Sequence, residues 1–218
     1  MSEKSTASLK YRAPQLAVVI ALACLSAACG ASRPYKYYIL DVPASAPSAQ
    51  APQFPITLLI GRVSVPLLYR DTRLVYGSGE VQLGTYEYNR WAEMPAEMLQ
   101  DNLVAAFRNT GQYRSVAKIG SSAHGDYILR GQLFSLYGVD RPTMVARFSM
   151  EIILFDSKSA SIVWNNRYSH DEPIQGKSVA NIVEAMDRNV QAAMSQFCTA
   201  LAQYFAAHPP QPDAAPTK

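Results

Sequence analysis

The sequence predicts a single domain of the α/β (α+β) class, in which two helices cover one face of a mostly antiparallel sheet. Alternating apolar and polar side chains over several segments indicate strands with one covered face. Two longer segments repeat apolar residues with the period of a helix. The composition agrees, because a chain of 218 residues that is 49% hydrophobic and 17% charged is typical of a globular protein.

The first strand-like segment is Tyr35 to Leu40, and a loop rich in proline, alanine and serine follows over residues 41–55. Residues 56–65 form the next predicted strand, but its apolar positions are even-numbered before Gly61 and odd-numbered after it. A slip by one residue turns the side chains of a strand to the other face. We therefore expect a β-bulge at Gly61.

A hairpin is predicted next, with strands at residues 73–76 and 80–88 and a Gly-Ser-Gly turn at residues 77–79. The helical period begins after it, over residues 94–108. Pro95 suits the first turn of this helix, because its missing N–H has no partner there in any helix. The apolar stripe of the helix consists of Met98, Leu99, Leu103, Ala106 and Phe107.

Three further strands are predicted, at residues 126–139, 146–154 and 162–169. The middle strand has the clearest alternation, and its even-numbered apolar residues are expected to point into the core. The opposite, polar face of this strand is expected to carry Arg147, Ser149 and Glu151.

A long helix is predicted over residues 178–207, and thirty helical residues span about 45 Å, enough to cross a whole sheet. Its apolar stripe consists of Val179, Ile182, Val183, Met186, Val190, Met194, Phe197, Leu201 and Phe205. The domain is therefore expected to span residues 35–207. The proline-rich residues 208–218 are expected to form a disordered tail.

Residues 1–28 predict a lipoprotein export signal. Three basic residues precede an uncharged run at 16–28, which is shorter than the about 20 residues of a membrane-spanning helix. Small residues before Cys29 resemble the lipobox of bacterial lipoproteins, where the signal is cut before a cysteine that carries acyl chains such as palmitate. We expect lipidation at Cys29 and a tether over residues 29–34. The alternatives are lipidation at Cys24, or an ordinary signal that leaves Cys29 unmodified.

The sequence contains no recognised catalytic, metal-binding or cofactor-binding motif. Beyond residue 28 it holds 17 basic and 16 acidic residues, which gives no reason to expect nucleic acid as a partner. His124, His170 and His208 lack the spacing of metal ligands. Cys198 lies beside the apolar stripe of the last helix, where a buried and inert thiol is expected. We therefore predict a protein without enzymatic activity, cofactor or metal.

Three segments carry a family resemblance: RPYKYYIL at residues 33–40, PLLYRDTRLVY at 66–76 and TYEYNRWAEMP at 85–95. In their order and spacing they resemble the ABC-type transport auxiliary lipoproteins, the group that includes the paraquat-inducible protein PqiC. The likeness covers residues 29–207. It implies an α/β fold and a non-enzymatic accessory role in an ABC transport system that uses an MCE-domain protein and moves lipids or other apolar compounds across the envelope.

The resemblance implies an MCE-domain protein and ABC transporter components as partners, and it leaves open whether the chain forms a homo-oligomer. Aromatic and arginine side chains dominate the energetics of protein interfaces. The candidate partner-binding residues are therefore Tyr86, Tyr88, Arg90 and Trp91. For Trp91, a core position at the entry of the helix is the favoured alternative.

The expected location is the periplasmic face of the outer membrane, with the lipid anchor in the inner leaflet. Gly30 rather than aspartate follows Cys29, which by resemblance to enterobacterial sorting rules favours the outer membrane over the inner one. Two other functions remain alternatives at this stage. One is a lipid-binding lipoprotein with its own pocket between helix and sheet, and the other is an envelope hydrolase.

Overall fold

The computed structural model describes residues 33–40, 51–78, 81–121, 124–139 and 144–210. The predicted signal, Cys24, Cys29 and the tail beyond residue 210 lie outside the described residues. The helices are α2 (Pro95–Asn109) and α3 (Val179–Ala207), and a short 3-10 helix, η1, spans Leu67–Tyr69. The strands are β1 (Lys36–Tyr38), β2 (Phe54–Ser64), β3 (Arg73–Ser78), β4 (Gln82–Trp91), β5 (Tyr113–Lys118), β6 (Tyr127–Val139), β7 (Val145–Asp156) and β8 (Ile162–Pro173).

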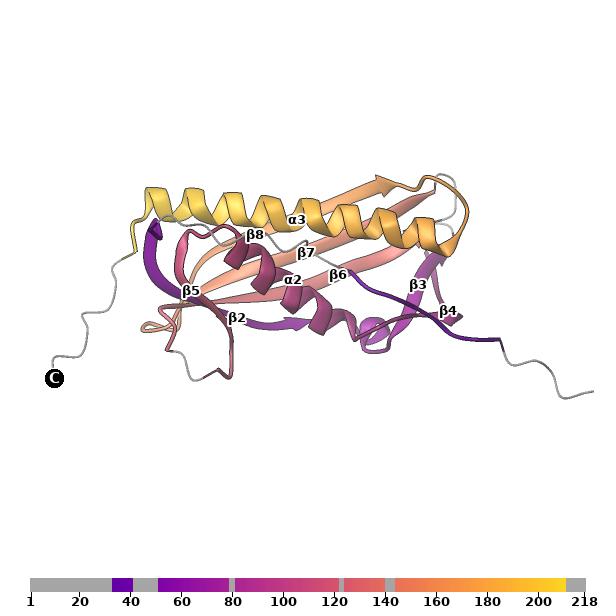
Figure 1. Cartoon of the computed structure of the whole chain (residues 1–218), viewed down its shortest axis with the longest axis horizontal. Coiled ribbons are helices and arrows are strands. Elements are labelled where there is room, and N and C mark those ends of the chain that lie inside the picture. Colours follow the sequence, from indigo (N-terminus) through magenta and orange to yellow (C-terminus); the bar gives the residue numbers. More distant parts are fainter. Residues whose placement is uncertain (1–32, 41–50, 79–80, 122–123, 140–143, 211–218) are drawn as a thin grey trace, which may run out of the picture. The chain divides into compact units, whose positions relative to one another are not determined.

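All eight described strands join one sheet, and the predicted α/β class with two helices on a single domain is confirmed (Figure 1). The order β1-β4-β3-β6-β2-β5 forms one path, while β7 pairs with β6 and β8 pairs with β7. The two longest ladders, β6–β7 and β7–β8, are antiparallel as expected. Four shorter pairings are parallel: β1–β4, β2–β5, β2–β6 and β3–β6.

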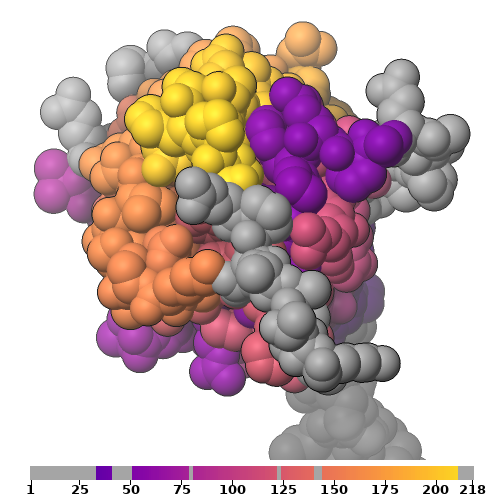
Figure 2. Space-filling model, turned by 90° about the vertical axis from the view of Figure 1, so that its left-hand side faces the viewer, coloured from indigo at the N-terminus to yellow at the C-terminus, as the bar shows by residue number. Residues whose placement is uncertain are grey.

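Both helices pack on the same face of the sheet, in front of the strands in Figure 1. Helix α3 packs on β6, β7 and β8, whereas α2 packs on β2 and β5, and the two helices touch each other. Under α3, the side chains of Ala146, Phe148, Met150, Ile152 and Leu154 are fully buried, which confirms the predicted inner face of β7. At the other end of this layer, the Phe54 ring lies 5.5 Å from that of Phe205, where the start of β2 meets the last turns of α3 (Figure 2).

The outer face of β7 differs from the prediction at one position. Arg147 and Glu151 are partly exposed there, but Ser149 is only 4% exposed, and its hydroxyl has no hydrogen-bond partner. Alternation therefore assigns the face of a strand residue correctly without fixing its exposure. Likewise Ile162 in β8, predicted to alternate with polar residues on the apolar side, is 60% exposed.

The ends of both helices follow local sequence signals. Pro95 occupies the first turn of α2, as predicted. Ser178 caps α3, because its hydroxyl accepts a hydrogen bond from the Asn181 N–H at 3.2 Å, and the Asn181 side chain accepts one in return from the Ser178 N–H. None of the helices in the described part of the chain has the length and apolar character that a membrane span requires.

The predicted irregularity at Gly61 is present, and the hairpin is shifted. The pairing of β2 with β6 changes register between Ile60 and Val63, on the two sides of Gly61. Strand β3 continues through Ser78, which pairs with Gln82, so the strand ends two residues later than predicted. Strand β5 has no counterpart in the prediction, and β2 begins at Phe54, inside the predicted loop.

Candidate partner-binding surface

The parallel pair β1–β4 brings together two segments that lie about fifty residues apart in the chain. Tyr37 pairs with Arg90, and Tyr38 pairs with Trp91. The Tyr38 hydroxyl donates a hydrogen bond to the Asn89 side chain at 3.1 Å, and the Ala92 N–H donates one to the Tyr38 carbonyl at 2.7 Å. In Figure 1 the indigo β1 runs along the end of the sheet that carries β3 and β4.

Strand β1 has one buried and one exposed face. Leu40 is buried and Tyr38 packs against the core, so this side fastens the strand to the domain. Tyr35, Tyr37 and Ile39 point away from it, and their side chains are 51%, 63% and 60% exposed. A contiguous row of large exposed apolar groups is unusual on a soluble domain and marks an interaction surface.

Strand β4 places two partly exposed side chains, one tyrosine and one arginine, beside this row. The rings of Tyr35 and Tyr88 lie 6.1 Å apart, and the guanidinium carbon of Arg90 lies 4.8 Å from the centre of the Tyr35 ring. Together, Tyr35, Tyr37, Ile39, Tyr88 and Arg90 define what we call the β1–β4 surface. It combines the side chains that contribute most to protein interfaces.

Arg90 is held in place by the second segment of the resemblance, at two residues that lie just after η1. Its guanidinium lies 3.5 Å from a carboxylate oxygen of Asp71 and 3.4 Å from the Thr72 hydroxyl. Burial tends to raise the pKa of Asp71, but hydrogen bonds from Arg73 outweigh it and hold the pKa below its ordinary value. Asp71 therefore stays ionised near neutral pH and orients both arginines.

Two of the four predicted contact residues belong to this surface. Tyr88 and Arg90 lie on it, as described above. Tyr86 is half-buried, packs against the core and lies on Tyr76 with 4.9 Å between the ring centres. Trp91 is 1% exposed and belongs to the core, which is the alternative that the sequence favoured. The Trp91 side chain is therefore not accessible to a partner in this structure.

Sequence reasoning did not single out Tyr35, Tyr37 and Ile39, although a signal for them existed. Between residues 35 and 40 the apolar side chains alternate. Tyr38 and Leu40 point toward the core, and Tyr35, Tyr37 and Ile39 point toward solvent. The inward pair could be recognised only with the partner strand in view. Because the pairing of β1 with β4 is parallel and distant in sequence, no local pattern indicates it.

Three observations on the described residues concern metal binding and nucleophilic groups. No three His, Cys, Asp or Glu side chains among the described residues lie close enough to hold a metal ion. Burial raises the pKa of the Cys198 thiol to about 12, so the group remains a protonated and poor nucleophile at neutral pH. His170 lies 3.7 Å from Glu172 on an exposed part of β8, where both are open to solvent screening.

Comparison with known proteins gives a family match and a matching fold. A family model described as "ABC-type transport auxiliary lipoprotein component" matches residues 38–197. A crystal structure of a protein from Xanthomonas campestris is 19% identical and covers 79% of this chain and 99% of its own, with a TM-score of 0.69. A second crystal structure, of an uncharacterised protein, is 16% identical with a TM-score of 0.61 and covers 78% of this chain and 99% of its own. No curated protein matches the chain in sequence.

Proposed function

The chain belongs to the family of ABC-type transport auxiliary lipoprotein components, and on this premise we propose that it docks an MCE-domain protein of an ABC transport system to the outer membrane. It acts there by binding and not by catalysis, while the system moves lipids or other apolar compounds across the envelope. The observation that carries the docking role is the β1–β4 surface, where the exposed Tyr35, Tyr37 and Ile39 lie beside the partly exposed Tyr88 and Arg90 at one edge of the sheet.

The proposed lipid anchor limits the distance between the β1–β4 surface and the membrane. In the proposal, acyl chains on Cys29 hold the protein in the inner leaflet of the outer membrane, and five residues separate Cys29 from Tyr35. Five extended residues reach about 17 Å. The β1–β4 surface begins at the first residue after this tether, so the anchor restricts it to the periplasmic zone next to the membrane. A partner that reaches across the periplasm would meet it there.

The chemistry of the surface favours a protein as its partner. Tyrosine side chains offer a large contact area and a hydroxyl group at small cost in conformational entropy. Arg90 already has Asp71 and Thr72 on one side and the Tyr35 ring on the other, so it is ordered before binding. An ordered arginine loses less entropy when it contacts a partner, which favours affinity.

The anchor is tested by labelling growing cells with an alkyne fatty acid. Wild-type protein should carry the label, and Cys29→Ser should lose it because the acylated thiol is gone. The matched control is Cys24→Ser, which should label normally. Label that persists in Cys29→Ser and disappears in Cys24→Ser would move the anchor to Cys24. An unlabelled wild-type protein would contradict the lipid anchor altogether.

The docking role is tested by measuring affinity between the detergent-solubilised full chain and the cognate MCE-domain protein. Tyr37→Ala and Ile39→Ala should each weaken binding by about tenfold, which corresponds to about 1.4 kcal/mol. The matched control is Ile162→Ala, because Ile39 and Ile162 are both 60% exposed, and Ile162 lies on β8 instead. Equal losses at Ile39 and Ile162 would exclude the β1–β4 surface as the docking site. If no transporter component binds, the docking role itself is wrong.

A further inference from the structure

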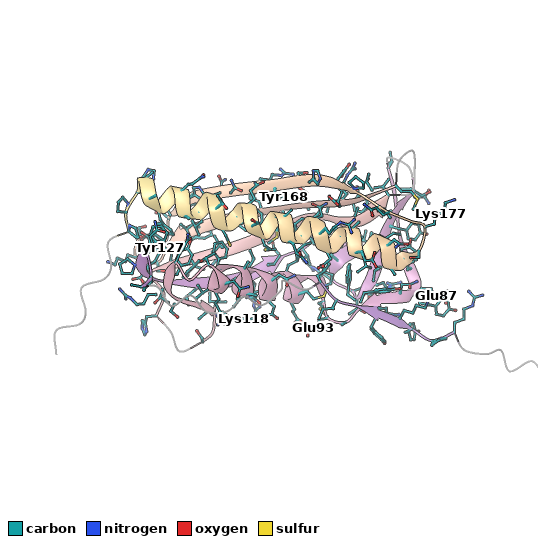
Figure 3. The ribbon with its side chains drawn as sticks, turned by 45° about the horizontal axis from the view of Figure 1, so that its top comes forward. Glu87, Glu93, Lys118, Tyr127, Tyr168 and Lys177 are labelled. Carbon is teal, nitrogen blue, oxygen red and sulfur yellow. The ribbon has the colours of Figure 1, made fainter. Side chains whose placement is uncertain are left out.

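An open hollow of about 490 Å³ lies on the sheet at a distance from the β1–β4 surface. It is lined by Arg62 of β2, by Arg130 of β6, and by Ile119 and Gly120, which follow β5. Figure 3 places Lys118, the last residue of β5, and Glu87, on β4, toward opposite ends of α3. The hollow is therefore separate from the surface to which we assign docking.

The β-bulge at Gly61 is what brings the two arginines together. Ile60 pairs with Leu129 and Val63 pairs with Gly131, so two residues of β2, Gly61 and Arg62, stand opposite the single residue Arg130. Without the extra residue, Arg62 would follow the alternation of β2 and turn toward the helices. The bulge instead leaves Arg62 exposed, on the side of the sheet where it lines the hollow with Arg130.

Neighbouring residues support this local arrangement from both sides. A Cβ atom at Gly61 would lie 2.8 Å from Cγ of Arg130, so the missing side chain makes room for the stem of that arginine. The Gln100 side chain of α2 donates hydrogen bonds to the carbonyls of Ile60 and Gly61, at 3.2 and 3.0 Å. These two hydrogen bonds give the carbonyl groups of the bulge a partner and hold its backbone against α2. The guanidinium carbon of Arg130 lies 4.8 Å from the centre of the Phe155 ring, which further orients it.

The charges in the hollow are unbalanced. Like charges opposite each other on neighbouring strands destabilise a sheet. No carboxylate among the described residues forms an ion pair with Arg62 or Arg130, whereas the nearby Lys118 is paired with Asp101. Two arginines placed together by a supported bulge, with no acidic partner, form a site that an anion would complete.

We propose that this hollow binds a phosphate group, either in the headgroup of a lipid or as free phosphate. A guanidinium presents a fork of N–H donors that fits a phosphate with two parallel hydrogen bonds. A carboxylate, with two oxygens and one charge, is satisfied by one such fork, whereas two forks match the three or four oxygens and the higher charge of a terminal or free phosphate. Ile119 provides an apolar wall for the body of a lipid, and the open space beside Gly120 leaves the backbone accessible.

Isothermal titration calorimetry on the full chain, solubilised in a neutral detergent and in phosphate-free buffer, tests the proposal. The probes are inorganic phosphate, short-chain dihexanoyl phosphatidic acid, whose headgroup is a terminal phosphate, and, as a control anion, acetate. We expect binding of at least one phosphate probe and no binding of acetate. Arg62→Gln and Arg130→Gln should each weaken the binding by about tenfold, because each removes one bidentate fork. The matched control is Arg167→Gln, since Arg167 also lies over an aromatic ring, that of Phe134, but outside the hollow.

The outcomes distinguish the two sources of the phosphate, and some of them would contradict the proposed site. Tighter binding of the lipid than of inorganic phosphate assigns a headgroup, and equal binding assigns the phosphate group alone. Binding of neither phosphate probe, equal binding of acetate, or an equal loss in Arg167→Gln would overturn the site. Thermal unfolding without ligand shows that the variants fold: Arg62→Gln should melt at the wild-type temperature or above it, because it removes a repulsion.

Discussion

The two faces of the sheet around β7 differ in the type of their side chains and in the role of those side chains. On the face covered by α3, five successive inward side chains are apolar and fully buried, and they form the centre of the core. On the open face, arginines lie over aromatic rings instead. These pairs are Arg130 with Phe155, Arg147 with Tyr137, and Arg167 with Phe134. Alternation along the neighbouring strands β6, β7 and β8 thus separates the side chains that stabilise the fold from those available for recognition.

The energies expected for the two faces differ accordingly. Removing a large buried side chain from a core costs about 2–5 kcal/mol, because transfer energy is lost and a cavity remains. A cation–π pair at an exposed site contributes about 0.5–1 kcal/mol. Substitutions on the open face should therefore alter binding while the domain stays folded. The β1–β4 surface and the arginine hollow both depend on this property.

The strongest test of the comparison is a charge placed on the covered face. Met150→Asp should unfold the domain, because an unpaired buried carboxylate costs several kcal/mol, a large part of the about 5–15 kcal/mol that stabilises a typical domain. Met150 is fully buried in β7. Far-UV circular dichroism and urea denaturation of the purified chain measure the effect.

The neighbouring residue of the same strand provides the control for Met150→Asp. Glu151→Ala changes the open face and should lower the free energy of unfolding by no more than about 0.5 kcal/mol. Ser149→Asp would be a poor control, since Ser149 is buried although it belongs to the open face. If Met150→Asp were as mild as Glu151→Ala, the assignment of the two faces of β7 would be wrong.

A polar network inside the covered face gives the next largest effect. The buried Asn189 of α3 donates hydrogen bonds to the carbonyls of Ala146 and His170, at 2.8 and 3.0 Å, and accepts one from the Tyr168 hydroxyl at 2.7 Å. Asn189→Ala removes the hydrogen-bond partner of all three groups. Each group that is left without a partner lowers the free energy of unfolding by about 1–3 kcal/mol unless water replaces the amide. We expect a loss of at least about 2 kcal/mol in urea denaturation.

Tyr168→Phe isolates one bond of this network. It removes the hydroxyl that donates to Asn189 and leaves the two carbonyl contacts of the amide in place. The expected loss is about 0.5–1.5 kcal/mol, and so smaller than that of Asn189→Ala. Equal losses in the two variants would mean that the hydroxyl, and not the contact of the helix with the strand carbonyls, carries the stabilisation.

Much of the covered face could be predicted from sequence, because its physics is local. The period of 2 in β7, the period of 3.6 in α3 and the place of Pro95 in the first turn of α2 each follow from residues close together in the chain. The slip at Gly61 was also visible as a change of parity. In each case residues within one short segment determine which side chains are buried or where a helix begins.

The recognition features could not be predicted in the same way, because they arise between distant segments. The β1–β4 surface requires a parallel pairing across about fifty residues, and the hollow requires Arg62 to stand beside Arg130. The role of Asn189 was hidden because a single polar residue near an apolar stripe does not show which carbonyls it will meet. Such features become visible only when the register of the sheet is known.

Apart from the control Glu151→Ala, the smallest expected effect is at the pair of Arg147 and Asp171 on the open face. The guanidinium donates two hydrogen bonds to the carboxylate, at 2.7 and 2.6 Å, and these bonds hold the pKa of Asp171 below its ordinary value. The side chains are 41% and 40% exposed, so solvent screens the pair. Asp171→Asn should therefore lower the free energy of unfolding at pH 7 by no more than about 1 kcal/mol.

The pH dependence shows whether the charge of Asp171 causes that loss. A carboxyl with a lowered pKa in the folded state adds stability at pH values above its unfolded pKa of about 3.9, and loses it as the pH falls through the folded value. The difference between wild type and Asp171→Asn in urea denaturation should thus be constant from pH 7 to about 5 and shrink below about pH 4. A difference that does not change with pH would assign the loss to packing. The open face would then resemble the covered one more closely than we infer.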